Sequence, residues 1–275
     1  MGIASIFLIN FSKYVTGENK MIFESHAHYD DDAFDEDREE LLTSLREHGI
    51  DKVINVGSSI DNCKATLQLM KQYFFIYGAM GVHPSETGEL NEENFTWLRE
   101  QCAVDKVVAV GEIGLDYHWK EPEVHIQKLW FERQMDLARE VKHPVIIHSR
   151  EAAKDTLDMM QALRAEEIGG VIHCYSYTKE IAREYLQMGY YFGIGGVITF
   201  QNAKKLKEAV EYIPIDRILL ETDSPYLAPE PNRGMRNSSL NLPYVAQEIA
   251  AIKGISYEEV VRITEENAER LFLES

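Results

Sequence analysis

The stretch PVIIHSREAAKDTLDMMQALRAEEIGGVIHC, residues 144–174, places an amphipathic segment between two short apolar runs. The runs 144–147 and 170–172 are rich in β-branched residues, which predicts buried strands. The segment 150–166 repeats its apolar residues at helical spacing, which predicts a helix. A strand, a helix and a second strand in this order indicate a βαβ unit with two parallel strands.

The same alternation extends along the chain from residue 21 onward. Eight apolar runs predict strands at 21–25, 52–56, 74–80, 107–110, 144–147, 170–172, 190–194 and 217–220. Amphipathic segments predict helices at 36–47, 61–72, 92–101, 123–141, 150–166, 179–188, 203–211, 242–252, 256–262 and 265–272. Ser256 and Thr264 carry capping signals for the last two.

Eight strand–helix repeats in about 250 residues favour closure into a (β/α)8 TIM barrel. No linker rich in proline, glycine or serine divides the chain, so residues 21–275 are expected to form a single domain. An open doubly wound sheet is the alternative. That fold would carry a glycine-rich phosphate loop after the first strand, and the sequence has none there.

The first 20 residues are interpreted as an amino-terminal extension or an over-assigned start. Their apolar run, 3–9, is too short to span a bilayer, and no basic residue precedes it as in a signal peptide. No other segment is apolar for long enough to span a membrane. The three cysteines are widely spaced and form no disulfide framework, which favours a reducing, cytoplasmic location.

The chain of 275 residues has 45% hydrophobic residues, enough for a large core, and a formal charge of −18. Such a surface repels nucleic acid and anionic membranes unless cations or a local basic patch intervene. No membrane contact and no obligate protein partner are therefore expected.

Histidines and carboxylates collect at the carboxyl ends of the predicted strands, where barrels place their chemistry. Five of the nine histidines stand at such ends: His26, His28, His83, His148 and His173. Glu112 follows the fourth run and Asp223 follows the eighth.

Only one residue separates His26 from His28. Alternate residues of a strand point to the same face, so both imidazoles are expected to point toward the barrel axis. A lone strand histidine is more often a hydrogen-bonded core residue. Two further histidines and two carboxylates at other strand ends would, however, leave several costly buried polar groups unpaired. A metal centre satisfies all of them.

Four imidazoles and two carboxylates exceed the needs of one four-coordinate ion with an open position, which indicates two ions. Glu112 is the expected bridge, because a carboxylate can give one oxygen to each of two cations about 3.5–4 Å apart. Asp223 is expected to ligate one ion and to accept a proton from the hydrolytic water. Imidazole with carboxylate suits Zn, Mn, Fe or Ni, and Mg is a further candidate.

Nine motifs together resemble the TatD family of deoxyribonucleases, which are metal-dependent hydrolases on a (β/α)8 barrel. They run from ESHAHYD near residue 24 to the end of the chain and include GVHP, VGEIGLDY, PVIIHSR, IHCYS, YFGIGGVITF, LLETDSPYLAPEP, RGMRN and NAERLF. The first 20 residues depart from the family pattern.

The resemblance implies two sets of metal ligands that share Glu112. One set is His26, His28, Glu112 and Asp223. The other is Glu112, His148 and His173. Relatives in the wider superfamily often bridge their metals with a carboxylated lysine. The glutamate at this position favours the nuclease branch over phosphotriesterase-like enzymes.

Four residues are candidate substrate contacts. His83 follows no ligand spacing, so a substrate contact is favoured over a ligand. Arg150 could hold a phosphate or balance the charge of the following helix. Arg233 and Arg236 lie in a loop after the last strand, where barrels often keep an anion site. Asp116 could line the mouth of the site or serve a turn.

The predicted function is a two-metal phosphodiester hydrolase that trims the ends of DNA, with RNA as an alternative substrate. Asp223 and Glu112 are the expected catalytic carboxylates. A small-molecule hydrolase acting on a lactone, amide or phosphoester with the same centre remains an alternative. A metal-binding barrel without activity is a third possibility, against which the complete ligand set argues.

Overall fold

Eight parallel strands form one sheet in the order β1 to β8 in the computed structural model, which describes residues 21–274. The strands are β1 (Ile22–Ala27), β2 (Ile50–Val56), β3 (Ile76–Met80), β4 (Val107–Asp116), β5 (Val145–Arg150), β6 (Gly170–Ile172), β7 (Tyr191–Ile194) and β8 (Ile218–Leu220). Each strand pairs in parallel with the next, and the whole set forms a nearly closed barrel. The predicted (β/α)8 fold is confirmed.

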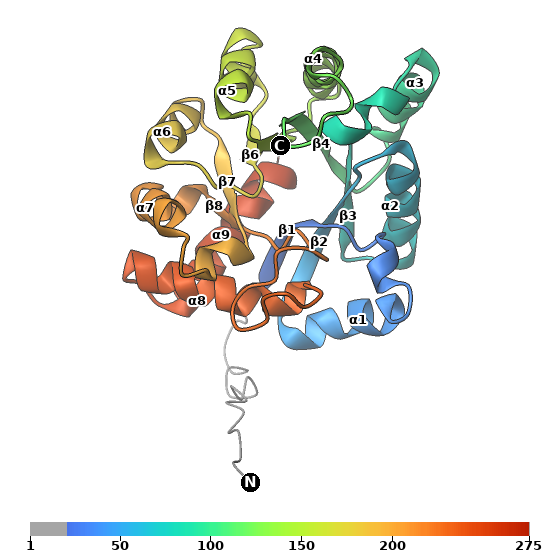
Figure 1. Cartoon of the computed structure of the whole chain (residues 1–275). Helices are drawn as coiled ribbons and strands as arrows, with labels where there is room; N and C mark the ends of the chain where they lie inside the picture. Colours follow the sequence, from blue (N-terminus) through green and yellow to red (C-terminus); the bar gives the residue numbers. More distant parts are fainter. Residues whose placement is uncertain (1–20, 275) are drawn as a thin grey trace.

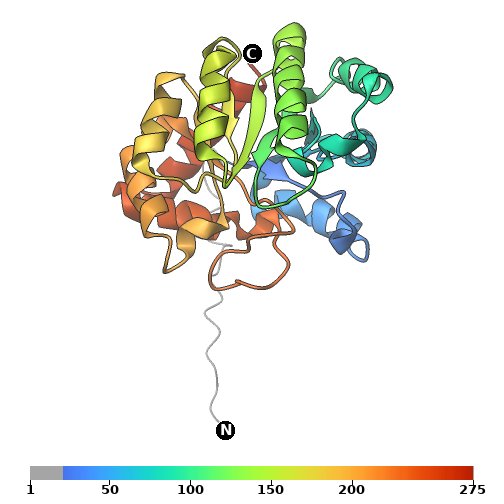
Figure 2. The same ribbon diagram turned by 45° about the horizontal axis from the view of Figure 1, so that its top comes forward.

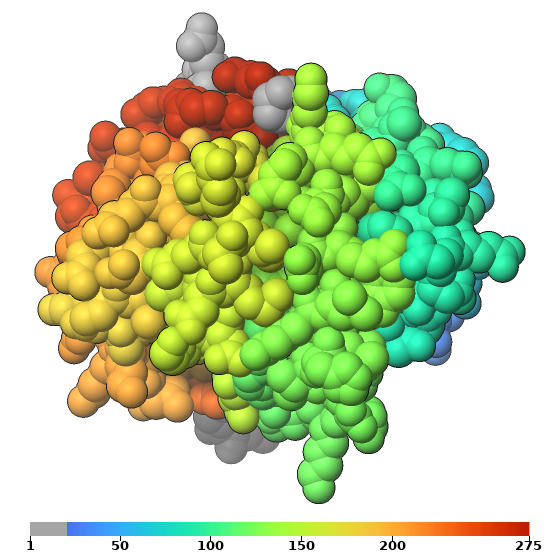
Figure 3. Space-filling model, turned by 90° about the horizontal axis from the view of Figure 1, so that it is seen from above, coloured from blue at the N-terminus to red at the C-terminus, as the bar shows by residue number. Residues whose placement is uncertain are grey.

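The helices surround the strands, as the view along the barrel shows (Figure 1). They are α1 (Arg38–Ser44), α2 (Ile60–Gln72), α3 (Glu92–Gln101), α4 (Val124–Val141), α5 (Ala153–Ala162), α6 (Lys179–Gln187), α7 (Lys204–Tyr212), α8 (Leu242–Lys253) and α9 (Tyr257–Phe272). Their packed side chains conceal the strands on the face formed by the middle of the chain (Figure 3). No helix within residues 21–274 is long and apolar enough to cross a membrane.

The join between β8 and β1 differs from the other strand pairs. A single bridge between Ala27 and Ser224 links this edge. Backbone bonds from His28 N to Ser224 O, 2.8 Å, and from Asp223 N to His26 O, 3.0 Å, extend the join beyond the strand ends. The same short segments carry three of the predicted metal ligands.

One hydrophobic cluster takes residues from all eight strands, which can meet only inside the barrel: Phe23, Ile54, Val56, Ala79, Val108, Ala109, Ile146, Val171, Tyr191 and Leu219. Leu271 and Phe272 at the end of α9 join the cluster. The interior at this level is therefore packed, and the polar site lies at the carboxyl ends of the strands. The long segment between β8 and α8, drawn in orange, projects beyond the barrel (Figure 2).

The final helix differs from the prediction of two helices. Ser256 caps its amino end as expected, accepting a hydrogen bond from Glu259 N at 3.1 Å. Thr264 does not begin a second helix, because its buried hydroxyl donates to Val260 O at 2.8 Å within one continuous helix. The predicted extension, residues 1–20, lies outside the described residues.

Candidate metal centre

Six predicted ligands from five strand ends converge at the carboxyl end of the barrel. His26 belongs to β1 and His28 follows it; Glu112 and His148 lie within β4 and β5. His173 follows β6, and Asp223 follows β8. Strands β4 and β5 are longer than predicted, so Glu112 and His148 are held within strands and not on loops.

One group of metal-ligating atoms consists of His26, His28 and Asp223. The two Nε2 atoms of the histidines are 3.1 Å apart. Asp223 Oδ1 lies 3.8 Å from Nε2 of His26 and 3.5 Å from Nε2 of His28. Three potential metal ligands thus face one point, two of them from the end of β1 and one from the segment after β8.

A second group consists of Glu112, His148 and His173. Glu112 Oε1 lies 2.6 Å from Nδ1 of His148 and 3.6 Å from Nε2 of His173. Its other oxygen, Oε2, lies 3.5 Å from Nε2 of His26 and 3.8 Å from Nε2 of His28. One carboxylate therefore presents one oxygen to each group, which is the geometry of a bridging ligand.

A hydrogen bond at His28 and an ion-pair contact at His173 show which ring nitrogen of these two histidines faces the centre. Nδ1 of His28 lies 2.8 Å from Val56 O, and because a carbonyl only accepts, this nitrogen carries the proton. Nδ1 of His173 lies 3.2 Å from Glu221 Oε1. A partner on the outer nitrogen leaves Nε2 with its lone pair toward the centre, as in most metal-bound histidines.

His148 lies between two carboxylates. Its Nδ1 faces Glu112, and its Nε2 lies 3.0 Å from Asp116 Oδ2. Asp116, at the end of β4, is buried and also accepts a hydrogen bond from His118 N at 2.9 Å. It therefore orients His148 from the side opposite Glu112.

The charges in the centre act strongly on one another because its groups are buried or half-buried and lie within a few ångströms of each other. Burial lowers the pKa of His28 and of His173. Neighbouring carboxylates raise both values: Asp223 and Glu112 raise the pKa of His28, and Glu221 and Glu112 raise that of His173. The net effect raises the pKa of His28 to about 9 and of His173 to about 10. For Glu112 burial raises the pKa, but the neighbouring histidines outweigh it and hold the pKa well below its usual value.

The donor set fits a divalent cation. Several nitrogen–oxygen distances between 3.5 and 3.8 Å are long for hydrogen bonds, yet all atoms of each group lie within 4.8 Å of one another. Buried His26 Nδ1 has no hydrogen-bond partner. Clustered imidazole rings repel one another when they carry protons, and a cation bound between deprotonated nitrogens replaces those protons.

The centre opens into a cleft of about 810 Å³, whose lining includes His83 and Arg150. His83 Nδ1 accepts a hydrogen bond from Ser85 N at 3.1 Å, so the proton of the neutral ring is on Nε2. Burial, with a further contribution from His148, lowers the pKa of His83 to about 3. His83 is therefore a neutral donor beside the centre.

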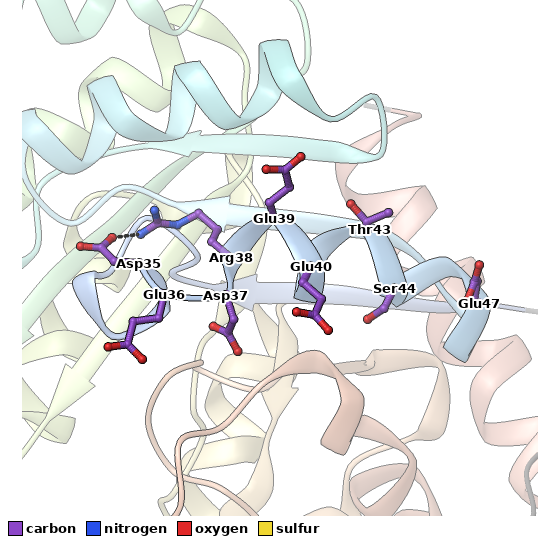
Figure 4. A pocket seen from close by; sticks show the side chains of 9 residues that line it. All are labelled: Asp35, Glu36, Asp37, Arg38, Glu39, Glu40, Thr43, Ser44 and Glu47. Carbon is purple, nitrogen blue, oxygen red and sulfur yellow. Dashed lines mark hydrogen bonds and ion pairs between the residues drawn. The ribbon is translucent and has the colours of Figure 1, made fainter.

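Arg233 and Arg236 do not line this cleft. Arg236 makes a bidentate ion pair with Asp37, with bonds of 2.7 and 2.6 Å. Arg233 lies over the ring of Phe200, 4.3 Å from its centroid. Asp37 belongs to a separate acidic hollow along α1, in which the guanidinium of Arg38 pairs with Asp35 (Figure 4).

Three buried carboxylates support the centre; Glu24 and Glu221 were not among the predicted site residues, and Asp116 was expected only to line the mouth or to serve a turn. Asp116 and Glu221 hold histidines, as described above. Glu24 accepts hydrogen bonds from Thr222 N at 2.8 Å and from Ser239 Oγ at 2.9 Å, and burial raises its pKa to about 8. An acidic residue inside an apolar strand was the available signal for Glu24.

The sequence of this chain matches the family model described as TatD related DNase over residues 23–273. It is 42% identical to an uncharacterized metal-dependent hydrolase, YabD, of Bacillus subtilis, over 92% of this chain and 99% of that protein. It is 33% identical to a protein of Cronobacter sakazakii named 3'-5' ssDNA/RNA exonuclease TatD, over 88% of this chain and 94% of that protein.

Among solved structures, the Escherichia coli TatD homologue YjjV superimposes with a TM-score of 0.87 at 28% identity, covering 93% of this chain and 99% of that one. An Entamoeba histolytica TatD-family hydrolase superimposes with a TM-score of 0.86 at 23% identity, covering 94% of this chain and all of that one, a likeness of fold. From the match over residues 23–273 and the identity to YabD, the chain belongs to the TatD family of metal-dependent hydrolases.

Proposed function

We propose that this hydrolase cleaves phosphodiester bonds at the ends of DNA strands, with RNA as a second substrate, using two divalent metal ions. The observation that carries the proposal is the position of Glu112, whose Oε2 faces His26 and His28 while its Oε1 faces His148 and His173. The name of the Cronobacter relative, an exonuclease, supports a nucleic acid substrate.

In this proposal His26, His28, Glu112 and Asp223 hold one ion. The second ion is held by Glu112, His148 and His173. Bound ions of this kind activate water and neutralise charge on phosphoryl oxygens. Zn, Mn, Fe, Ni and Mg are the candidates for imidazole and carboxylate ligands.

Asp223 is the proposed acceptor of the proton from the attacking water. Burial raises its pKa, but the hydrogen bond with His28 and the charges of His173 and His26 lower it further, so that the net pKa is below its usual value. Asp223 is therefore ionised at neutral pH, and its side chain keeps 17% exposure toward the cleft. An ionised carboxylate at the edge of the water-filled cleft can take up a proton.

Two other side chains are proposed to contact the substrate phosphate. Arg150 is the one arginine or lysine among the residues that line the cleft, and its guanidinium can bind a phosphoryl oxygen. His83 presents its Nε2–H and remains neutral, so it can donate a hydrogen bond without giving up its proton. These contacts bind and orient the reacting group.

The test is hydrolysis of end-labelled single- and double-stranded oligonucleotides by metal-reconstituted protein, beside a panel of lactones and phosphotriesters. We expect products shortened from an end, and loss of activity after chelation and in His148→Ala. His48→Ala, which removes an exposed histidine bonded to Ser44 O, should retain activity. Turnover of a lactone or phosphotriester with no cleavage of oligonucleotides would contradict the proposal.

Salt dependence provides a second test. A cleft with one arginine engages few phosphates, so log(kcat/KM) should fall only gently with log salt. Each phosphate contact on duplex DNA contributes a slope of about −0.9. A slope steeper than about −5 would therefore contradict binding through only a few phosphates.

A further inference from the structure

Part of the rim of the cleft is aromatic and apolar, beside exposed charged residues such as Glu86 and Arg150. Residues 21–274 contain ten large hydrophobic side chains that are strongly exposed, and three of them line this cleft: Trp119, Tyr226 and Leu227. Trp119 is 54% exposed and Tyr226 is 55% exposed. Exposed apolar side chains gathered at one site indicate a surface that binds a ligand.

The two aromatic side chains come from opposite sides of the barrel. Trp119 lies in the loop between β4 and α4, and Tyr226 lies in the segment after β8. Strands four places apart in a closed ring of eight face each other across the axis, so these loops flank the centre from two sides.

Each ring is held by a neighbour while most of its surface stays free. The hydroxyl of Tyr226 donates to Asp31 Oδ2 at 2.9 Å, which anchors the ring at its tip. The ring of Trp119 meets that of His118 edge to face, with centroids 5.0 Å apart. Such rings offer flat faces at little cost in side-chain entropy.

Electrostatic attraction cannot supply the binding energy for the parts of the substrate beyond the reacting phosphate. Apart from the proposed metal ligands and Asp116, which pairs with His148, the charged side chains among the described residues that line the cleft are three carboxylates and one arginine: Asp30, Asp31, Glu86 and Arg150. Phosphates on either side of the reacting one would therefore meet a repulsive surface. The neutral parts of a nucleotide, its bases, remain as the groups that this rim can attract.

We propose that Trp119 and Tyr226 stack on unpaired bases on the two sides of the metal centre, and that this contact selects single-stranded ends. The inference rests on the proposed function for the nature of the substrate. Base faces within a duplex are covered by their neighbours, so an unpaired end is the form that can stack on both rings. Every base has such a face, so little sequence preference is expected.

The experiment compares ring removal with ring retention on two substrates. The variants are Trp119→Ala and Tyr226→Ala, with Trp119→Phe and Tyr226→Phe as controls that keep a ring. Tyr212→Ala removes an exposed aromatic residue of α7 outside the cleft. The substrates are a short single strand and the same strand with abasic sites at its end, which has equal charge but no terminal bases.

For the intact strand, each alanine variant should raise KM about tenfold, and kcat should change little. The phenylalanine variants and Tyr212→Ala should stay near wild type. For the abasic strand, wild type should lose the contributions of both rings together, about a hundredfold in KM, and the alanine variants should lose nothing further. Equal effects of the alanine variants on both strands would overturn the stacking contact.

Binding provides a readout that is independent of turnover. Fluorescence anisotropy of a labelled phosphorothioate single strand, which resists hydrolysis, should show the same loss of affinity in the alanine variants. Binding that depends on the rings, in a protein that cleaves no oligonucleotide, would support stacking and refute the proposed hydrolysis. Cleavage without any effect of the rings would refute stacking alone.

Discussion

Raising the pH should weaken the fold of the metal-free protein, because three buried groups hold protons more tightly in the folded chain. The pKa of His28 rises from 6.5 to about 9, and that of His173 to about 10. The pKa of Glu24 rises from 4.5 to about 8. A group whose pKa is higher in the folded state stabilises the fold below its unfolded pKa and loses that contribution as the pH approaches the folded value.

The two histidines lose their contribution from pH 6.5 upward, to about 9 and about 10. Glu24 loses its contribution between 4.5 and about 8, in the same direction. A difference of one pKa unit corresponds to about 1.4 kcal/mol. For His28 alone, the difference between 6.5 and about 9 removes about 3 kcal/mol from the free energy of unfolding.

The assay is urea unfolding of EDTA-treated protein, followed by circular dichroism from mildly acidic to alkaline solution. The midpoint should fall steadily above pH 6.5. In metal-loaded protein the fall should be smaller, because metal-bound histidines carry no proton on the ligating nitrogen.

Two variants sharpen the test. His28→Asn should reduce the pH dependence, whereas His48→Gln, at an exposed histidine of the α1–β2 connection, should keep it. A midpoint that stays constant from pH 6.5 to 9 in the metal-free protein would refute the reasoning.

Three substitutions test the individual carboxylates of the centre. Glu112→Gln should lower the metal content as well as the rate, because a neutral side chain between two cations offsets their repulsion less than a carboxylate does. Full metal content by elemental analysis would count against a bridging role for Glu112. Asp223→Asn should lower turnover at least about 100-fold with a smaller loss of metal, and near-normal turnover would exclude Asp223 from the mechanism. Asp116→Asn should weaken metal binding about 10- to 100-fold by releasing His148, measured by chelator competition; unchanged affinity would show that Asp116 does not orient this ring.

The sequence was sufficient to predict the barrel because each strand-forming run ended in a recognisable change of residue type. It also predicted which six side chains would converge, because the parallel strands of a barrel all end on one rim. The spacing of His26 and His28 led to the same conclusion as the structure, in which their Nε2 atoms are 3.1 Å apart.

The supporting carboxylates could not be found by this reasoning. Glu221 and Asp116 each contact a histidine from another strand, and a strand pattern does not reveal contacts between strands. The positions of Arg233 and Arg236 depend on the path of a long loop. Asp37, far away in the sequence, pairs with Arg236 outside the cleft.

The join between β1 and β8 has a consequence for how the protein is made. Asp223 is synthesised long after His26 and His28 and meets them only across this join. A ribosome must therefore translate the strands from β2 to β8 before the first ligand group can be complete. A chain released just before residue 223 would carry the second group, which ends at His173, but would present His26 and His28 without their carboxylate partner.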